Sequence, residues 1–309
     1  GFDSVVFRYA EYNDGQKGLR YGTLDNVTWG HGLLMKNYSS RIAGPITQNN
    51  QQTALKGFVN FDRFGIQAMS TWSHIYALRL TERITPWLIL GQSYVTDTDG
   101  PRVVLPDGSS VQNPAVSGMA ADASVPLPLN FEGYAEAAQL FGHGSAATVG
   151  IDWAMDALVL SAAFDAGYRI VDRSFVPGYF GPDYEINPID FTSYEASGQS
   201  KNGYIADLKL VATNLLRLNA VYESDCGSNA SLYADAYTEL DRITASYYYK
   251  QPNFADLRSL TYEEGAITGG SLGYKITPNL IAAVNFKNAY DPVLGKVVES
   301  RYYEVKLAF

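Results

Sequence analysis

From Ala147 to Arg169 the chain reads ATVGIDWAMDALVLSAAFDAGYR. Up to Met155, one parity of this stretch is apolar and the other is small or polar: Ala147, Val149, Ile151, Trp153 and Met155 alternate with Thr148, Gly150, Asp152 and Ala154. A period of two residues is typical of a β-strand whose two faces meet different surroundings. After a turn at Asp156-Ala157 the alternation resumes, so the stretch predicts an antiparallel hairpin.

The same alternation recurs in most of the chain, notably at residues 206–212, 216–223, 242–250 and 280–287. It is weaker at 116–125, 231–239 and 30–38. In the last of these segments the parity slips around His31 and Gly32, which indicates a β-bulge. The pattern therefore predicts an all-β protein.

The composition excludes several classes of protein. The chain has 309 residues, of which 46% are hydrophobic and 18% charged, so it is too apolar to be disordered. A single cysteine excludes a disulfide scaffold, and a net charge of −9 argues against nucleic-acid binding. No run of about 20 apolar residues exists to form a membrane-spanning helix. The first residues lack an initiator Met and a signal-peptide pattern, so we interpret the chain as mature or trimmed.

The connections between the expected strands are of two kinds. Tight turns are expected near Asp25-Asn26, Asp62-Arg63, Thr85-Pro86, Pro126 to Pro128, Asp156-Ala157, Thr213-Asn214, Leu240-Asp241 and Thr277 to Asn279. Between them lie the other connections, and the long ones are residues 37–52, 96–114, 172–203 and 251–265. Short turns at one end and longer loops at the other are typical of membrane β-barrels. Pairing two strands at each tight turn and adding a first and a last strand predicts about 18 strands, or 16 if one hairpin is false.

A membrane barrel explains the two-faced strands better than a soluble one. About 18 strands with an apolar interior would enclose more volume than side chains can fill. With apolar residues facing lipid and charged residues facing water, strands of roughly 9 to 11 residues are long enough to span. We therefore expect one domain over residues 1–309: a transmembrane, antiparallel, up-and-down β-barrel with short periplasmic turns and longer extracellular loops.

Tyr303, Val305, Leu307 and Phe309 share one parity at the end of the chain. This segment resembles the end of a bacterial outer-membrane porin, since members of that family end in such a strand with a terminal Phe. The segment from Tyr21 to Gly32 is also similar to a porin hairpin, although Trp29 and His31 replace the usual Leu and Arg. The resemblance implies a bacterial outer-membrane location, contact with membrane lipid and recognition of the last strand by the outer-membrane assembly machinery.

The expected lumen carries both signs of charge. The ionisable residues predicted to line it are Arg79, Asp152, Asp165, Arg169, Asp207, Lys209, Arg217, Glu223, Arg242, Lys250 and Lys287. The long, aromatic-rich loop 172–203 carries the acids Asp183, Glu185, Asp190 and Glu195. We expect this loop to fold into the lumen and oppose the cations of the wall. The alternative is a loop that caps the outside or contacts a partner.

No residue pattern predicts an enzyme, a metal or a cofactor. His31, His74 and His143 lie in separate connections, and none of them is placed by sequence beside a matching nucleophile and acid. Asp97 and Asp99 resemble the start of a calcium loop, but position 108, where a bidentate Glu belongs, is Gly. A solvated turn is the better interpretation there.

We therefore expect a porin for passive diffusion of small hydrophilic solutes and ions. One alternative is a plugged or partner-bound structural barrel of a larger envelope complex. Another is a substrate-specific sugar channel, for which Tyr233, Tyr237 and Tyr248 share the inward parity. Ion selectivity stays open, and so does the choice between a monomer and a homotrimer.

Overall fold

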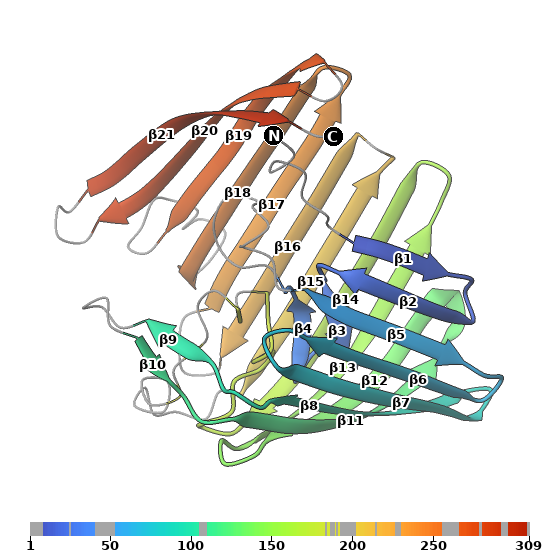
Figure 1. Cartoon of the computed structure of the whole chain (residues 1–309). Coiled ribbons are helices and arrows are strands. Elements are labelled where there is room, and N and C mark those ends of the chain that lie inside the picture. Colours follow the sequence, from blue (N-terminus) through green and yellow to red (C-terminus); the bar gives the residue numbers. More distant parts are fainter. Residues whose placement is uncertain are drawn as a thin grey trace. The chain divides into compact units, whose positions relative to one another are not determined.

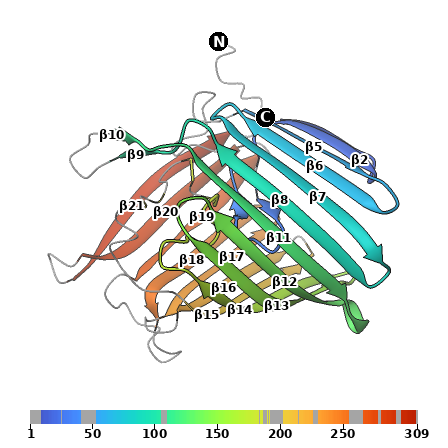
Figure 2. The same ribbon diagram turned by 90° about the horizontal axis from the view of Figure 1, so that it is seen from below.

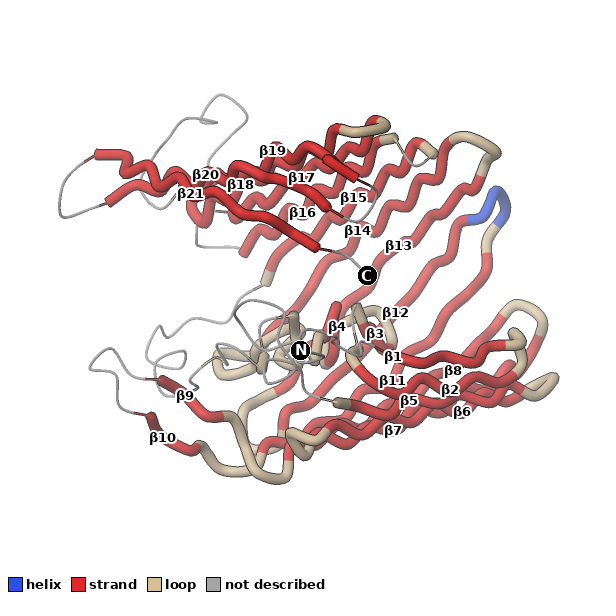
Figure 3. The backbone as a smooth tube through the Cα atoms, turned by 45° about the horizontal axis from the view of Figure 1, so that its top comes forward, coloured by secondary structure: helices blue, strands red, loops and turns tan. Residues whose placement is uncertain are grey.

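The fold was obtained as a computed structural model. It describes residues 9–24, 26–40, 53–104, 110–182, 184–185, 189, 191, 202–213, 215–225, 230–254, 266–277, 280–291 and 296–307. Strand accounts for 74% of these described residues and helix for 2%, and Figure 3 shows the short helical turn Pro128–Asn130 in blue. Among the described residues, no helix is both long enough and apolar enough to span a membrane. The predicted all-β fold is confirmed.

Most strands belong to one antiparallel sheet. The 17 strands in it are β1 (Tyr9–Asn13), β2 (Lys17–Gly22), β5 (Ala54–Asn60), β6 (Phe64–Thr71), β7 (Ile75–Thr85), β8 (Leu88–Asp97), β11 (Val116–Pro126), β12 (Phe131–Leu140), β13 (Ser145–Asp156), β14 (Leu160–Val171), β15 (Gly203–Ala212), β16 (Leu216–Asp225), β17 (Ala230–Leu240), β18 (Ile243–Phe254), β19 (Ile267–Thr277), β20 (Leu280–Asp291) and β21 (Lys296–Leu307). Two small sheets pair β3 (Val27–Trp29) with β4 (Met35–Tyr38), and β9 (Arg102–Val104) with β10 (Ser110–Gln112).

Seven of the eight predicted tight turns lie between consecutive strands of the large sheet. The exception is the turn expected at Asp25-Asn26, which was wrong. Strand β2 instead pairs with β1, across a turn at residues 14–16, and with β5. The weak segments 116–125 and 231–239 lie in strands β11 and β17, and β17 has a register shift against β18 between Ala230 and Leu232.

The porin-like hairpin predicted from Tyr21 to Gly32 is therefore not formed, because Tyr21 and Gly22 belong to β2 of the large sheet and Val27–Trp29 forms β3 of a small one. Strands β3 and β4, the short blue arrows in Figure 1, form a pair of their own. Trp29, Leu33, Leu34 and Met35 are each at most 2% exposed. Three consecutive buried apolar residues do not fit a strand with one polar face, so this segment packs as a core instead.

The chain divides into two compact units. Unit 1 comprises Gly1–Pro126, Gly133–Val149 and Arg169–Lys201, and unit 2 comprises Leu127–Glu132, Gly150–Tyr168 and Asn202–Phe309. In unit 1 the strands pair in the order β1, β2, β5, β6, β7, β8 and β11, and Figure 2 shows β5 to β8 and β11 side by side. In unit 2, strands β15 to β21 pair in chain order.

The pairing register gives the sheet of each unit an apolar face and a polar face. In unit 2, one row of paired residues contains Ala245, Leu272, Val284 and Tyr303. Leu272 is 58% exposed and Tyr303 82% exposed. The next row along β18 to β20 contains Ser246, Ser271 and Asn285 and lies on the other face. The charged residues of these strands therefore stand mainly on the face opposite the exposed apolar side chains.

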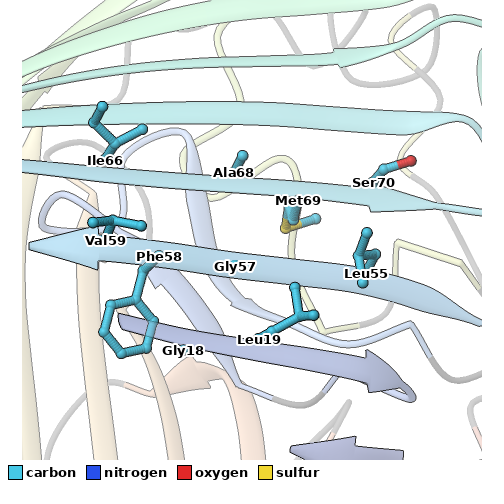
Figure 4. Close-up of a pocket in the computed structure, with 10 residues that line it drawn as sticks. All are labelled: Gly18, Leu19, Leu55, Gly57, Phe58, Val59, Ile66, Ala68, Met69 and Ser70. Carbon is cyan, nitrogen blue, oxygen red and sulfur yellow. The ribbon is translucent and has the colours of Figure 1, made fainter. Parts of the chain in front are cut away.

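Unit 1 has the same exposed apolar face. Its members include Leu19, Tyr21, Leu55, Phe64, Ile66, Tyr76, Leu78, Leu80, Leu90, Tyr94 and Met119, each more than a third exposed. Where Gly57 and Ala68 replace larger residues, the face is hollowed into an apolar groove of about 440 Å³ over β2, β5 and β6 (Figure 4). Exposed apolar surface on this scale is unusual for a protein in water.

Candidate functional site

The polar face of unit 2 is built on one continuous row of paired residues. The row crosses seven neighbouring strands: Lys209, Asn219, Asp235, Tyr248, Gly269, Lys287 and Ser300. A second row runs from Val211 through Arg217, Tyr237, Ser246 and Ser271 to Asn285. Since side chains alternate strictly across a strand, this register brings together residues that are far apart in sequence.

Some of the charged residues on the polar face of unit 2 form ion pairs and others do not. Lys275 Nζ contacts Glu239 Oε1, and the Tyr237 hydroxyl donates to Glu239 Oε2 at 2.8 Å. Lys209 lies 3.7 Å from Asp207. Within the described part of the chain, Lys250 and Lys287 have no carboxylate partner. The guanidinium of Arg217 interacts electrostatically with Glu239 and lies 5.7 Å from the ring centre of Tyr237.

In unit 1 the polar face carries a buried ion pair. Arg79 donates through Nη1 and Nη2 to both carboxylate oxygens of Asp122, at 2.7 and 2.9 Å, and Nη1 also donates to Ser93 Oγ at 2.8 Å. The side chains of Arg79 and Asp122 are 11% and 3% exposed. A Cβ at Gly91 would lie 2.4 Å from Asp122 Oδ2, so only glycine leaves room for the pair there.

The other half of this face is apolar and covered. We call the covering element the insert: the β3–β4 hairpin together with residues 174–182. Phe180 forms a parallel bridge with Met35, and the backbone N–H groups of Gly178 and Phe180 donate to Leu33 O and Leu34 O at 2.7 and 3.2 Å. Residues of the insert and the sheet form one buried cluster, including Trp29, Met35, Phe175 and Phe180 from the insert and Met69, Ile75, Val95, Val116, Leu140 and Val171 from the sheet.

Glu136 on β12 anchors the hairpin of the insert. Its Oε2 accepts hydrogen bonds from the backbone N–H groups of His31 and Leu33, both at 3.1 Å. Gly30 has a φ of +62°, and a Cβ there would lie 2.4 Å from Glu136 Oε1. The hairpin connection therefore requires glycine both for its backbone conformation and for its close approach to the carboxylate.

Two carboxylates anchor the loop that follows β14. Glu185 Oε1 accepts hydrogen bonds from the Tyr38 hydroxyl at 2.5 Å and from Ser73 Oγ at 2.7 Å. The Tyr184 hydroxyl donates to Asp97 Oδ2 at 2.7 Å. Burial raises the pKa of Glu185 above its ordinary value, and the Asp97 carboxylate adds to this, although the Tyr38 and Ser73 hydrogen bonds lower it. Among the residues that the structure describes, Glu185 thus bonds to hydroxyl groups and not to cations of the wall.

The structure places the remaining residues predicted for the lumen, the long loop and the assembly signal as follows. Asp152 and Asp165 lie on the same face of their strands as buried residues of those strands. Arg169 is buried, and Glu223 pairs with Ser231 on the neighbouring strand. Arg242 differs from expectation, because it lies in the β17–β18 turn and donates to the Tyr274 hydroxyl at 3.4 Å. Tyr303 and Val305 of the expected assembly signal are exposed, and Leu307 pairs with Leu280. Asp183, Asp190, Glu195 and Phe309 lie outside the described residues.

The calcium candidates Asp97 and Asp99 and the three histidines contact other residues of the chain. Asp97 Oδ1 accepts from the backbone N–H groups of Asp99 and Gly100, and Asp99 contacts His74 Nδ1 at 2.6 Å. His31 stacks on Tyr134, and His143 stacks on Phe191. The three histidines therefore occupy three separate environments.

Sequence reasoning missed Asp122, Glu136 and the hairpin of the insert. Asp122 and Glu136 occur in weakly alternating, alanine-rich strands, where their parity is the only signal. The hairpin was signalled by the parity slip near His31 and by the run Leu33-Leu34-Met35. A bulge was inferred from that slip, although a run of buried residues indicates a packed insertion better.

Comparisons with known proteins find a likeness only among solved structures. No family model matches the chain, and no curated protein matches it. Among solved structures, it is similar to OccK11 (OpdR) of Pseudomonas aeruginosa, with 10% identity and a TM-score of 0.46 over 96% of this chain and 87% of that one. It is also similar to OccAB3 and OccAB4 of Acinetobacter baumannii, at 14% and 8% identity, TM-scores of 0.39 and 0.41, and coverage of 97% and 96% of this chain and 90% and 91% of theirs. All three are outer-membrane porins of Gram-negative bacteria.

The buried ion pair of unit 1 yields a first prediction. Arg79→Ala should destabilise the protein by about 3–5 kcal/mol, because it leaves the Asp122 carboxylate buried without its partner. The double variant Arg79→Met with Asp122→Leu should lie much closer to the parent, since neither charge remains. Urea unfolding followed by tryptophan fluorescence measures both. Equal losses in the single and double variants would contradict this account.

The anchoring of Glu185 yields a pH prediction. The pKa of Glu185 is raised when the loop after β14 is packed against the sheet, so protonation of Glu185 favours this docked state. Docking should therefore strengthen as the pH falls from the raised pKa towards the ordinary value of 4.5. Hydrogen-exchange protection of the Gly178 and Phe180 amides, corrected for intrinsic rates, measures this. Glu185→Gln, which has no charge to lose, should reduce the pH dependence. Protection that weakens on acidification would refute the prediction.

Proposed function

We propose that this chain is an outer-membrane porin: a single β-barrel that forms a water-filled channel for passive diffusion of small hydrophilic solutes. One observation carries the proposal, namely that the exposed face of the sheet in both units is apolar while charged residues stand on the opposite face. A soluble sheet buries its apolar face, but this one exposes it. In a bilayer the same arrangement places the apolar face against lipid and the charges against water.

Strand length supports the same conclusion. Every strand from β11 to β21 has 10 to 12 residues, and a tilted strand needs about 9–11 to cross the hydrocarbon core. In hydrocarbon every backbone N–H and C=O must be paired, which the continuous antiparallel ladder within each unit achieves for its inner strands.

Within this function the insert is the proposed constriction. Its hydrophobic contacts with the sheet and its anchors Glu136 and Glu185 favour a fixed element. We keep Asp183, Asp190 and Glu195 as proposed acids of the channel and Tyr303, Val305, Leu307 and Phe309 as the proposed assembly signal. No chemical reaction is part of this function.

The packed insert also favours a second candidate, a plugged barrel that serves as a structural or assembly component of the envelope. The insert is held by a buried hydrophobic core that includes Trp29 and Phe180, so we expect it to stay in place. This candidate predicts a folded membrane protein without steady conductance.

Single-channel recording decides between the two functions. Purified protein reconstituted in a planar bilayer should show a steady ohmic conductance, and its reversal potential in a salt gradient reports ion preference. Detergent without protein serves as the blank. Protein shown to be folded in vesicles that gives no conductance would refute the porin and favour the plugged barrel.

A matched pair of substitutions tests the orientation of the two faces. Leu272→Arg places a charge on the apolar face and should destabilise the protein in lipid vesicles by about 2–4 kcal/mol if the site lies near the bilayer midplane. Ser271→Arg adds the same side chain one residue earlier, on the polar face, and should be tolerated. Urea unfolding in vesicles measures both. A larger loss for Ser271→Arg would reverse the assignment of the faces.

A further inference from the structure

Three tyrosines gather around one acid on the polar face of unit 2. Tyr233, Asp235 and Tyr237 occupy alternate positions on β17, so their side chains share a face and the two rings start about 13 Å apart. Tyr248 on β18 is the direct partner of Asp235. We call these four residues the tyrosine cluster.

The ring of Tyr248 lies flat on the sheet. A Cβ at Gly269, its partner on β19, would be 2.6 Å from ring atoms of Tyr248. The ring therefore occupies the space above a glycine, and one of its faces covers the backbone of β19. Its other face is turned away from the sheet and forms a platform.

The other members are held in place by neighbours. The Tyr237 hydroxyl donates to Glu239 Oε2 at 2.8 Å. Asp235 Oδ1 accepts a hydrogen bond from Asn219 Nδ2 at 3.1 Å, and its carboxylate also bonds with Tyr233. The described neighbours that bond with Asp235 are uncharged, so the carboxylate keeps acceptor capacity for hydroxyl groups.

We propose that the tyrosine cluster binds a short neutral oligosaccharide on its way through the channel. Aromatic platforms stack on the apolar C–H faces of sugar rings, while the Asp235 carboxylate accepts hydrogen bonds from sugar hydroxyls and the Tyr248 hydroxyl donates to them. The spacing of about 13 Å between Tyr233 and Tyr237 suits a ligand longer than one ring. This inference rests on the proposed porin function and names its substrate class.

Flanking charges exclude two other ligands. A quaternary ammonium ion also favours tyrosine rings beside an acid. Arg217 lies over Tyr237, however, and Lys250 is paired with Tyr233, so a cation would meet two positive groups. An anion would meet Asp235 at the centre of the cluster. A neutral, hydroxyl-rich ligand satisfies the acid without opposing either base.

The test is block of the open channel by maltotriose. Added to a conducting bilayer, maltotriose should reduce the current in a saturable manner, and Tyr248→Ala should weaken the apparent affinity about fivefold to tenfold. Tyr247→Ala is the matched control, because Tyr247 is the preceding residue and faces the apolar side; it should leave block unchanged. Gly269→Ala should act like Tyr248→Ala, since the added methyl displaces the ring.

Failure of the sugar site and failure of the channel are distinguishable. A conducting channel that maltotriose does not block overturns the sugar proposal and leaves the porin intact. If the protein does not conduct, calorimetric titration of folded protein in detergent with maltotriose tests the site directly, and absence of binding overturns it. Block by choline that depends on Tyr248 while maltotriose has no effect would also overturn the sugar assignment.

Discussion

The pairing of every strand with its neighbours is the constraint on which the rest of this structure depends. A face of sheet that meets hydrocarbon offers no hydrogen-bond partners, so the backbone must satisfy itself within the ladder. Once the register of β15 to β21 is set, each residue is committed to one face, and a slip by one position would bring Lys287 and Asp235 to the apolar side. The tight turns between consecutive strands hold that register locally. The chemistry of both faces is thus a consequence of strand pairing.

Unit 1 shows how this constraint accommodates a second core. Near the long connections its polar-face parity carries Ile75, Val95 and Leu140, which would face water if nothing covered them. The insert covers them, and its own backbone is satisfied partly by the bridge between Met35 and Phe180 and partly by Glu136. Nearer the tight turns the same parity carries Arg79 and Asp122. One sheet face therefore holds both a hydrophobic core and a buried ion pair.

Much of the fold could be predicted from the sequence because a period of two is a local signal. The hairpin from Ala147 to Arg169 and seven tight turns follow from it directly. The pairing of β2 with β5 could not be predicted, because it skips the residues that form β3 and β4, which pack against Phe180, far along the chain. Glu136 was missed for the same reason: its role is to accept hydrogen bonds from His31 and Leu33, 105 and 103 residues away.

The net charge of the chain does not predict the electrostatic field at the polar faces, because some of the charged residues there form ion pairs. The chain carries a charge of −9, yet on the described polar faces Asp122 is neutralised by Arg79 and Glu239 contacts Lys275. Lys250 and Lys287 have no such partner among the described residues. The polar face of unit 2 therefore combines these two bases with the hydrogen-bonded acid Asp235. A solute at that face meets these groups at short range, whereas charges elsewhere are screened beyond about 8 Å at physiological salt.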